Sequence, residues 1–128
     1  MSEEKKSLNF IEQIIEEDLA NGMPKENLRF RFPPEPNGYL HIGHTKAIGI
    51  SFGLGKQYNA PVNLRFDDTN PAKEEQEYID SIIEDVKWLG FDIGEGPLYA
   101  SHCFDQMYNY ALELIKMGKA YICELSAD

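Results

Sequence analysis

The amino-acid sequence predicts an α/β fold in which a parallel sheet is wrapped by helices. Short apolar segments with a strand pattern alternate along the chain with longer segments whose apolar residues recur at helical spacing. The connections are short and a helix separates each pair of strands, which is typical of parallel strands joined by crossovers. At 128 residues, the chain is the size of one globular domain or of part of a larger one.

Composition excludes several classes of protein. The sequence has no apolar run long enough to span a bilayer, and its N-terminus lacks the apolar core of a signal peptide. Cys103 and Cys123 lie far apart, so two free thiols in a reducing cytoplasm are expected rather than a disulfide or a zinc site. The net charge of −10 repels phosphate backbones on average. Any nucleic-acid contact must therefore be local or lie on another part of a longer protein.

The first two elements are a helix and a strand. A helix is expected over residues 8–20, because its apolar side chains form one stripe and Gly22 follows as a stop signal. The stripe consists of Phe10, Ile11, Ile14, Ile15 and Leu19. A strand is expected over residues 28–32, where apolar and polar residues alternate.

A second helix and strand follow a proline-rich loop. The composition of residues 42–58 is helical, although Gly49, Gly53 and Gly55 lower the helix propensity. Such glycines suit a helix that is pressed closely against a sheet. The second strand is expected over residues 62–66.

The third helix is expected to begin at Pro71, with Asn70 as its N-cap, and to end at Gly90. Its apolar face carries Tyr78, Ile79, Ile82, Ile83, Val86 and Leu89. Trp88 and the tyrosines are interpreted as core or helix-packing residues.

The last part of the chain predicts a third strand over residues 97–100, a fourth helix and a fourth strand over residues 120–125. Ser101 is interpreted as the cap of the helix, which ends at Gly118. The helix is expected to bury Phe104, Met107, Tyr108, Ala111, Leu112 and Ile115. The whole pattern resembles half of a nucleotide-binding sheet.

The loop after the first strand carries the strongest functional signal. It reads PPEPNGYLHIGHTK over residues 33–46 and lies where helix N-termini present free amides beyond the carboxyl ends of parallel strands. Its prolines and Gly38 favour a rigid turn, and Gly43 leaves room for a base or ribose to approach the backbone. His41 and His44 lie three residues apart, on one side of the helix start, where both can donate hydrogen bonds to a phosphate. A helix cap with two surface histidines would explain the HxxH pair alone, but not its combination with the rigid turn.

These residues carry a family resemblance. PPEPNGYLHIGH resembles the first signature motif, of the HIGH type, in class I aminoacyl-tRNA synthetases of the glutamine/glutamate subgroup. Asn37, the later FDDTNP and the N-terminal NFIEQIIEEDL resemble the bacterial-type glutamine enzymes in particular. The resemblance runs from about Asn9 to the last residue.

The resemblance implies a Rossmann-like catalytic domain that activates glutamine with ATP and transfers it to its tRNA. His41 and His44 would be catalytic, stabilising the α-phosphate as the carboxylate of the amino acid attacks it. Catalysis would rest on positioning and charge stabilisation. Mg²⁺ is expected with ATP, and no metal site of the protein's own is expected. By resemblance, the ATP site is lined by Glu35, Pro36, Asn37, His41, Ile42, Gly43, His44, Thr45, Lys46 and Ala47.

Two charged residues at strand ends are candidates for the amino-acid site. Asp67 directly follows the second strand, and a carboxylate there could hold the α-ammonium of an amino acid. The structural alternative is a turn shaped by Asp67 and its neighbours. Arg31, near the end of the first strand, matches by resemblance an arginine that meets the substrate side chain in the glutamate enzymes. A salt-bridged arginine is the alternative for Arg31.

Several readings of the whole chain remain open. Residues 1–26 are expected to form a helical extension, and residues 27–128 the first half of the catalytic domain, cut at its C-terminal end. No KMSKS-like second signature is present, so this chain alone is expected not to charge tRNA. The alternatives are a glutamyl-tRNA synthetase of the archaeal or eukaryotic type, a small nucleotidylyltransferase, which FDDTNP disfavours, and a non-catalytic ATP-binding fragment.

Overall fold

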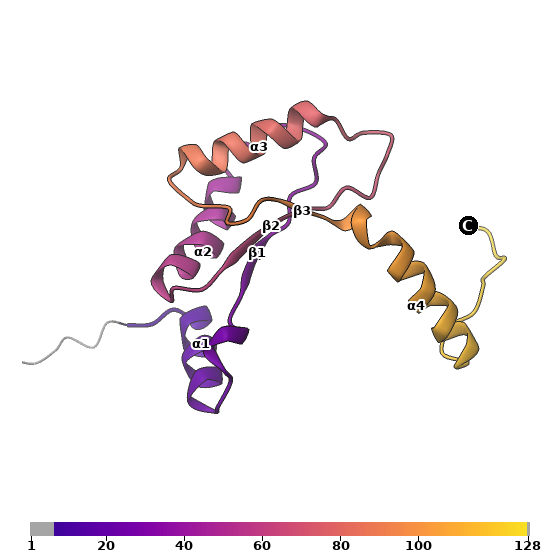
Figure 1. Cartoon of the computed structure of the whole chain (residues 1–128), viewed down its shortest axis with the longest axis horizontal. Helices are drawn as coiled ribbons and strands as arrows, with labels where there is room; N and C mark the ends of the chain where they lie inside the picture. The colour runs from indigo at the N-terminus through magenta and orange to yellow at the C-terminus, as the bar shows by residue number, and fades with distance from the viewer. Residues whose placement is uncertain (1–6, 128) are drawn as a thin grey trace, which may run out of the picture.

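The structure is a computed structural model, and it describes residues 7–127. Its sheet has three parallel strands in the order β1-β2-β3, which confirms the predicted α/β fold with a parallel sheet (Figure 1). The strands are β1 (Phe30–Phe32), β2 (Val62–Phe66) and β3 (Leu98–Tyr99). In register, Phe32 of β1 pairs with Leu64, and Phe66 of β2 pairs with Tyr99.

Four α-helices accompany the sheet in the described part of the chain. They are α1 (Phe10–Ala20), α2 (His44–Gln57), α3 (Gln76–Trp88) and α4 (Phe104–Lys116), and two short 3-10 helices cover Lys25–Asn27 and Ala100–Cys103. Helix α2 connects β1 to β2, and α3 connects β2 to β3, so each parallel pair is joined by a helical crossover. In Figure 1, α3 lies across the end of α2.

The main core lies between one face of the sheet and helices α2 and α3. Leu64 and Phe66 are two residues apart on β2, so they point to the same face, and both are fully buried. The core consists of Phe32, Ile48, Phe52, Leu64, Phe66, Ile82, Val86 and Ile93. Because α2 and α3 both contribute to it, the positions of their ends relative to the sheet are fixed by apolar packing.

Helix α1 packs against the end of α2 through a second, smaller cluster. Ile15, Leu28 and Leu54 form its buried part. Glu12 is buried, and its carboxylate accepts hydrogen bonds from Asn9 and, at 3.0 Å, from the Gln57 side chain. Asn9 caps the helix, because its side chain accepts from the Glu12 backbone amide at 2.9 Å. Of the predicted stripe, Phe10 and Ile14 are exposed.

Gly55 allows α2 to approach β2 closely. A Cβ atom at this position would lie 2.2 Å from Val62 Cγ2 and 3.0 Å from the Ala60 carbonyl oxygen. At Gly49 and Gly53 a Cβ atom would meet nothing within 4 Å. The expectation of a helix pressed against the sheet is therefore confirmed at one of the three glycines.

The predicted start of α3 is wrong. The helix begins at Gln76, and the Asn70 side chain accepts instead from the Ala72 backbone amide, at 3.2 Å. The Asn70 amide donates to the Glu74 carboxylate at 2.8 Å. An asparagine that bonds the amide two residues on closes a turn of its own, which competes with helix capping.

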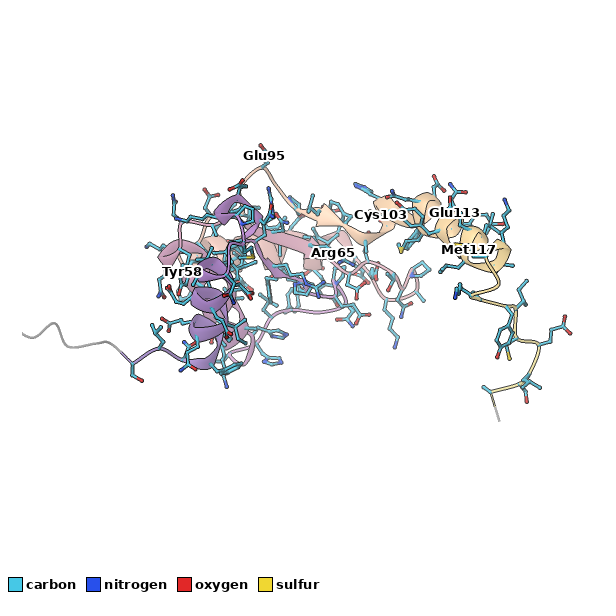
Figure 2. The ribbon with its side chains drawn as sticks, turned by 90° about the horizontal axis from the view of Figure 1, so that it is seen from below. Tyr58, Arg65, Glu95, Cys103, Glu113 and Met117 are labelled. Atoms are coloured by element: carbon cyan, nitrogen blue, oxygen red, sulfur yellow. The ribbon has the colours of Figure 1, made fainter. Side chains whose placement is uncertain are left out.

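In the last quarter of the chain the third strand and the fourth helix are confirmed, but the predicted core of the helix and the fourth strand are wrong. Helix α4 has no buried residue, so the six apolar residues expected in a core are exposed. Figure 2 shows Glu113 in α4, with Cys103 just before the helix and Met117 just after it, and the helix extends away from the sheet. Residues 120–125 form no strand, since a strand needs a neighbouring ladder and none lies beside them in the described residues. Trp88, expected to be a core or helix-packing residue, is 83% exposed, so it is not part of the core. Within residues 7–127, no helix is long and apolar enough to cross a membrane.

Replacing Gly55 by alanine tests the close approach of α2 and β2. The variant Gly55→Ala should lower the free energy of unfolding by about 1–3 kcal/mol, because the added methyl group must displace Val62. Gly53→Ala is the matched control and should raise it by about 0.5–1 kcal/mol, because alanine favours the helix and the space is open. Urea denaturation measures both, and equal effects of the two variants would contradict the packing described here.

Candidate functional site

His41 and His44 form a compact turn at the start of α2. The His41 backbone amide donates to His44 Nδ1 at 3.0 Å, and the Gly43 amide donates to His41 Nδ1 at 3.1 Å. The His44 amide in turn donates to the His41 carbonyl oxygen at 2.9 Å, and the two ring centroids are 4.0 Å apart. The structure therefore brings the two histidines together, as the HxxH spacing predicts.

The backbone bonds determine which ring nitrogens can donate. In both histidines Nδ1 is the acceptor of a backbone N–H. A neutral imidazole carries one proton, so in each ring the proton belongs on Nε2. Each ring then presents an Nε2–H donor beside the N-terminus of a helix, which is a favourable arrangement for an anionic group.

Gly43 makes room for the side chain of His41. A Cβ atom there would lie 2.8 Å from His41 Cε1 and 3.0 Å from His41 Nδ1. This gives Gly43 a local role, and the approach of a base or ribose to its backbone stays a prediction. Glycine is needed because the His41 ring folds back over the position that a Cβ atom would occupy.

A shallow pocket of about 180 Å³ lies between the histidine turn and the end of α3. Its lining consists of Leu40, His41, Ile42, His44, Thr45, Ile48, Asp85, Trp88 and Leu89. Ile42 is 88% exposed and Trp88 is 83% exposed, so two large apolar side chains flank the imidazoles at the surface. This combination of donors and exposed apolar groups can accept a ligand with an anionic part and a flat or apolar part.

The other predicted ATP-site residues lie on the same loop and helix turn, but not all of them reach the pocket. Pro36 is fully buried and supports the loop from inside. Glu35, Asn37, Lys46 and Ala47 are exposed and do not line the pocket. Among residues 7–127, no group of three His, Cys, Asp or Glu side chains is arranged to hold a metal ion.

Asp67 and Arg31 lie beside the loop rather than in the pocket. The Asp67 amide donates to the Pro34 carbonyl oxygen at 2.9 Å, which places Asp67 at the start of the histidine loop, as its strand-end position predicts. Its side chain is half-buried, whereas Arg31, paired in register with Asn63, is exposed. Neither side chain lines the histidine pocket.

Asp68 makes a contact that sequence reasoning missed. Its carboxylate accepts hydrogen bonds from the Ser101 backbone amide at 2.8 Å and from the Ser101 hydroxyl. Ser101 was expected to cap the following helix, but instead it ties the start of that helix to the end of β2. The two adjacent aspartates in FDDTNP are the only sequence signal for this hydrogen bond, and they do not indicate that Ser101 is the donor.

The environment of Asp68 lowers the pKa of its carboxyl group. Partial burial alone would raise this pKa, but the hydrogen bonds from Ser101 and the nearby His102 outweigh burial and hold it below the ordinary value of 3.8. The folded chain therefore binds fewer protons than the unfolded chain between the two pKa values. This contribution to stability is present above pH 3.8 and is lost as the pH falls through the pKa of the folded state.

Asp68→Asn should lower the free energy of unfolding at pH 7 by about 1–2 kcal/mol, because a charged acceptor is replaced by a neutral one. The difference from wild type should shrink as the pH falls below the folded pKa of Asp68, where the wild-type carboxyl is protonated too. Urea denaturation at a series of pH values measures this. Thr69→Ala changes an exposed neighbour and should leave the pH dependence of the free energy of unfolding unchanged. A difference between Asp68→Asn and wild type that is the same at every pH would contradict a lowered pKa for Asp68.

Comparison with known proteins places this geometry in a family. Residues 27–128 match the family described as tRNA synthetases class I (E and Q), catalytic domain. The chain is 60% identical over 127 residues to the glutamine–tRNA ligase of Haemophilus influenzae, a match that covers 99% of this chain and 23% of the relative. It is 59% identical over 128 residues to that of Clostridioides difficile, covering 100% of this chain and 23% of the relative.

A third relative agrees with these two. The glutamine–tRNA ligase of Pseudomonas putida is 58% identical over 120 residues, which cover 94% of this chain and 21% of the relative. The chain therefore spans less than a quarter of the length of the curated relatives that it matches. Since the family match covers residues 27–128, which include the histidine turn and the sheet, the chain belongs to the class I tRNA synthetases (E and Q).

Proposed function

We propose that this chain is the N-terminal part of a glutamine–tRNA ligase, in which residues 1–26 form a helical extension and residues 27–128 the first half of the catalytic domain. The observation that carries the proposal is the histidine pair, whose backbone bonds leave two Nε2–H donors beside a pocket at the start of α2. The names of the relatives support glutamine as the amino acid. The exposed thiols of Cys103 and Cys123 suit a cytoplasmic protein.

The proposed chemistry follows from what these side chains can do. The loop around the histidine pair would bind ATP, and the two Nε2–H groups would donate to the α-phosphate as the glutamine carboxylate attacks it and pyrophosphate leaves. Such preorganised donors act because they already point to where negative charge develops. Asp67, at the start of the same loop, would hold the α-ammonium of glutamine. Mg²⁺ would enter with the phosphates of ATP and neutralise part of their charge.

The nearest alternative is a glutamate enzyme of the archaeal or eukaryotic type. In that reading Arg31 would meet the carboxylate of the substrate side chain. Arg31 is exposed at the β1 strand that leads into the histidine loop, and this amino-acid-site role stays a proposal. The glutamine assignment is preferred because the relatives are named glutamine–tRNA ligases.

ATP binding to the 128-residue chain tests the role of the histidine turn. Wild type should show saturable NMR shifts centred on residues 35–47, and a variant with both His41→Ala and His44→Ala should lose them because both donors are gone. The third histidine of the chain supplies the control: His102→Ala, outside the pocket, should bind ATP as wild type does. Equal binding by all three proteins would exclude the histidine turn as the nucleotide site.

The second prediction concerns catalysis in a longer chain. A chimera in which these residues replace the matched N-terminal segment of the Haemophilus influenzae relative should charge tRNA with glutamine. In that chimera His41→Ala should lower kcat by about a hundredfold to a thousandfold, as is usual for the loss of one preorganised donor. A folded chimera that binds ATP but charges no tRNA would favour a non-catalytic ATP-binding role for this chain.

A further inference from the structure

Tyr39, two residues before His41, is tied to helix α3. Its hydroxyl donates a hydrogen bond to the Glu77 carboxylate, and its ring packs edge-on against Tyr78 with 5.0 Å between the ring centroids. Glu77 and Tyr78 both belong to the first turn of α3. A ring that is 59% exposed therefore has two specific partners far along the sequence.

The same helix also meets the other end of this segment. Asp85, Trp88 and Leu89, at the end of α3, line the pocket together with His41 and His44. Helix α3 thus runs beside the segment from Tyr39 to His44, with its first turn at the tyrosine and its last turn at the histidines. Figure 1 shows α3 lying across the N-terminal end of α2 in keeping with this arrangement.

The orientation of the histidine turn relative to the rest of the chain is set by the segments on either side of it. The hydrogen bonds of the histidine pair are local, since they join residues 41–44 to one another. What relates the turn to the rest of the chain is α2 on one side and the pair Tyr39 and Leu40 on the other. Leu40 packs against the main core, and Tyr39 is held on α3. Only two peptide units separate Tyr39 from His41, so a shift of the tyrosine is transmitted to the imidazole.

We propose that Tyr39 is a positioning residue for the histidine pair, holding the turn against α3 through Glu77 and Tyr78. With Tyr39 in place, both imidazoles keep the orientation in which Nδ1 accepts from the backbone and Nε2–H faces a ligand. Edge-on aromatic pairs and hydrogen bonds to a carboxylate both have preferred directions, so the two contacts together fix the ring. The hydrogen bond to Glu77 is the largest of the effects that raise the pKa of Tyr39 above its ordinary value of 10.0.

The test compares Tyr39→Phe with wild type in the 128-residue chain by ¹⁵N NMR of the histidine rings, at about pH 8, above the usual titration range of imidazole. Wild type should show Nε2–H tautomers for His41 and His44, and Tyr39→Phe should shift both toward mixed tautomers. The Kd for ATP should rise about fivefold, which corresponds to roughly 1 kcal/mol. The measurement of the Kd rests on the proposed function, whereas the measurement of the histidine tautomers does not.

The chain offers a matched control. The Tyr58 hydroxyl donates to the Glu16 carboxylate at 3.0 Å, and in Figure 2 Tyr58 lies beside α1, so this tyrosine–glutamate link does not involve the histidine loop. Tyr58→Phe should leave the histidine signals and the Kd unchanged. Glu77→Ala should reproduce the effect of Tyr39→Phe, and Glu77→Gln, which keeps an oxygen acceptor, should have a smaller effect.

Two results would overturn the proposal. One is a Tyr39→Phe variant with wild-type histidine signals, and the other is an equal shift of those signals in Tyr58→Phe. If wild type binds no ATP but the histidine signals respond to Tyr39→Phe and not to Tyr58→Phe, the positioning role is supported and the proposed ATP site alone fails.

Discussion

The close contact between α2 and β2, which a glycine at position 55 permits, is the constraint on which the site depends. A Cβ atom at Gly55 would lie 2.2 Å from Val62 Cγ2, so the helix backbone packs directly on the Val62 side chain. Ile48 and Phe52 of the same helix then reach the main core. Because α2 contacts the sheet and the core at Ile48, Phe52 and Gly55, its N-terminal end has a defined place relative to the sheet. That end carries the histidine pair.

The segment that follows β2 is held from two sides. The Asp67 amide bonds to the loop before the histidines, and the Asp68 carboxylate bonds to Ser101 after β3. A backbone held in this way has less conformational freedom to lose if one of its side chains binds a ligand. Asp68 thus orders the backbone on one side and the Asp67 amide on the other, which fixes where the Asp67 side chain leaves the chain for its proposed role.

The strongly acidic composition is compatible with the proposed phosphate site because that site is local. The net charge of −10 is spread over the chain, whereas the histidine turn offers two directed N–H donors beside a helix N-terminus. Short-range hydrogen bonds act over a few ångströms, while the average field of exposed acidic side chains is screened beyond about 10 Å at ordinary ionic strength. Arrangement of donors, rather than total charge, decides whether a phosphate can bind here.

The sequence by itself determined the α/β alternation, the strands β1 and β2, the apolar face of α3 and the pairing of His41 with His44. These are consequences of short-range rules: side-chain period, turn residues and spacing along one helix turn. It did not determine where α3 begins, since Asn70 can close a turn or cap a helix with the same side chain. Nor could periodicity show that the apolar face of α4 is exposed, because an amphipathic pattern does not identify what, if anything, covers it. Three contacts were decided only by the tertiary structure: the His41 ring over Gly43, the bond from Ser101 to Asp68, and the packing of Tyr39 on α3. Each depends on the direction in which the folded backbone points a side chain, and the spacing of residues along the sequence does not give that direction.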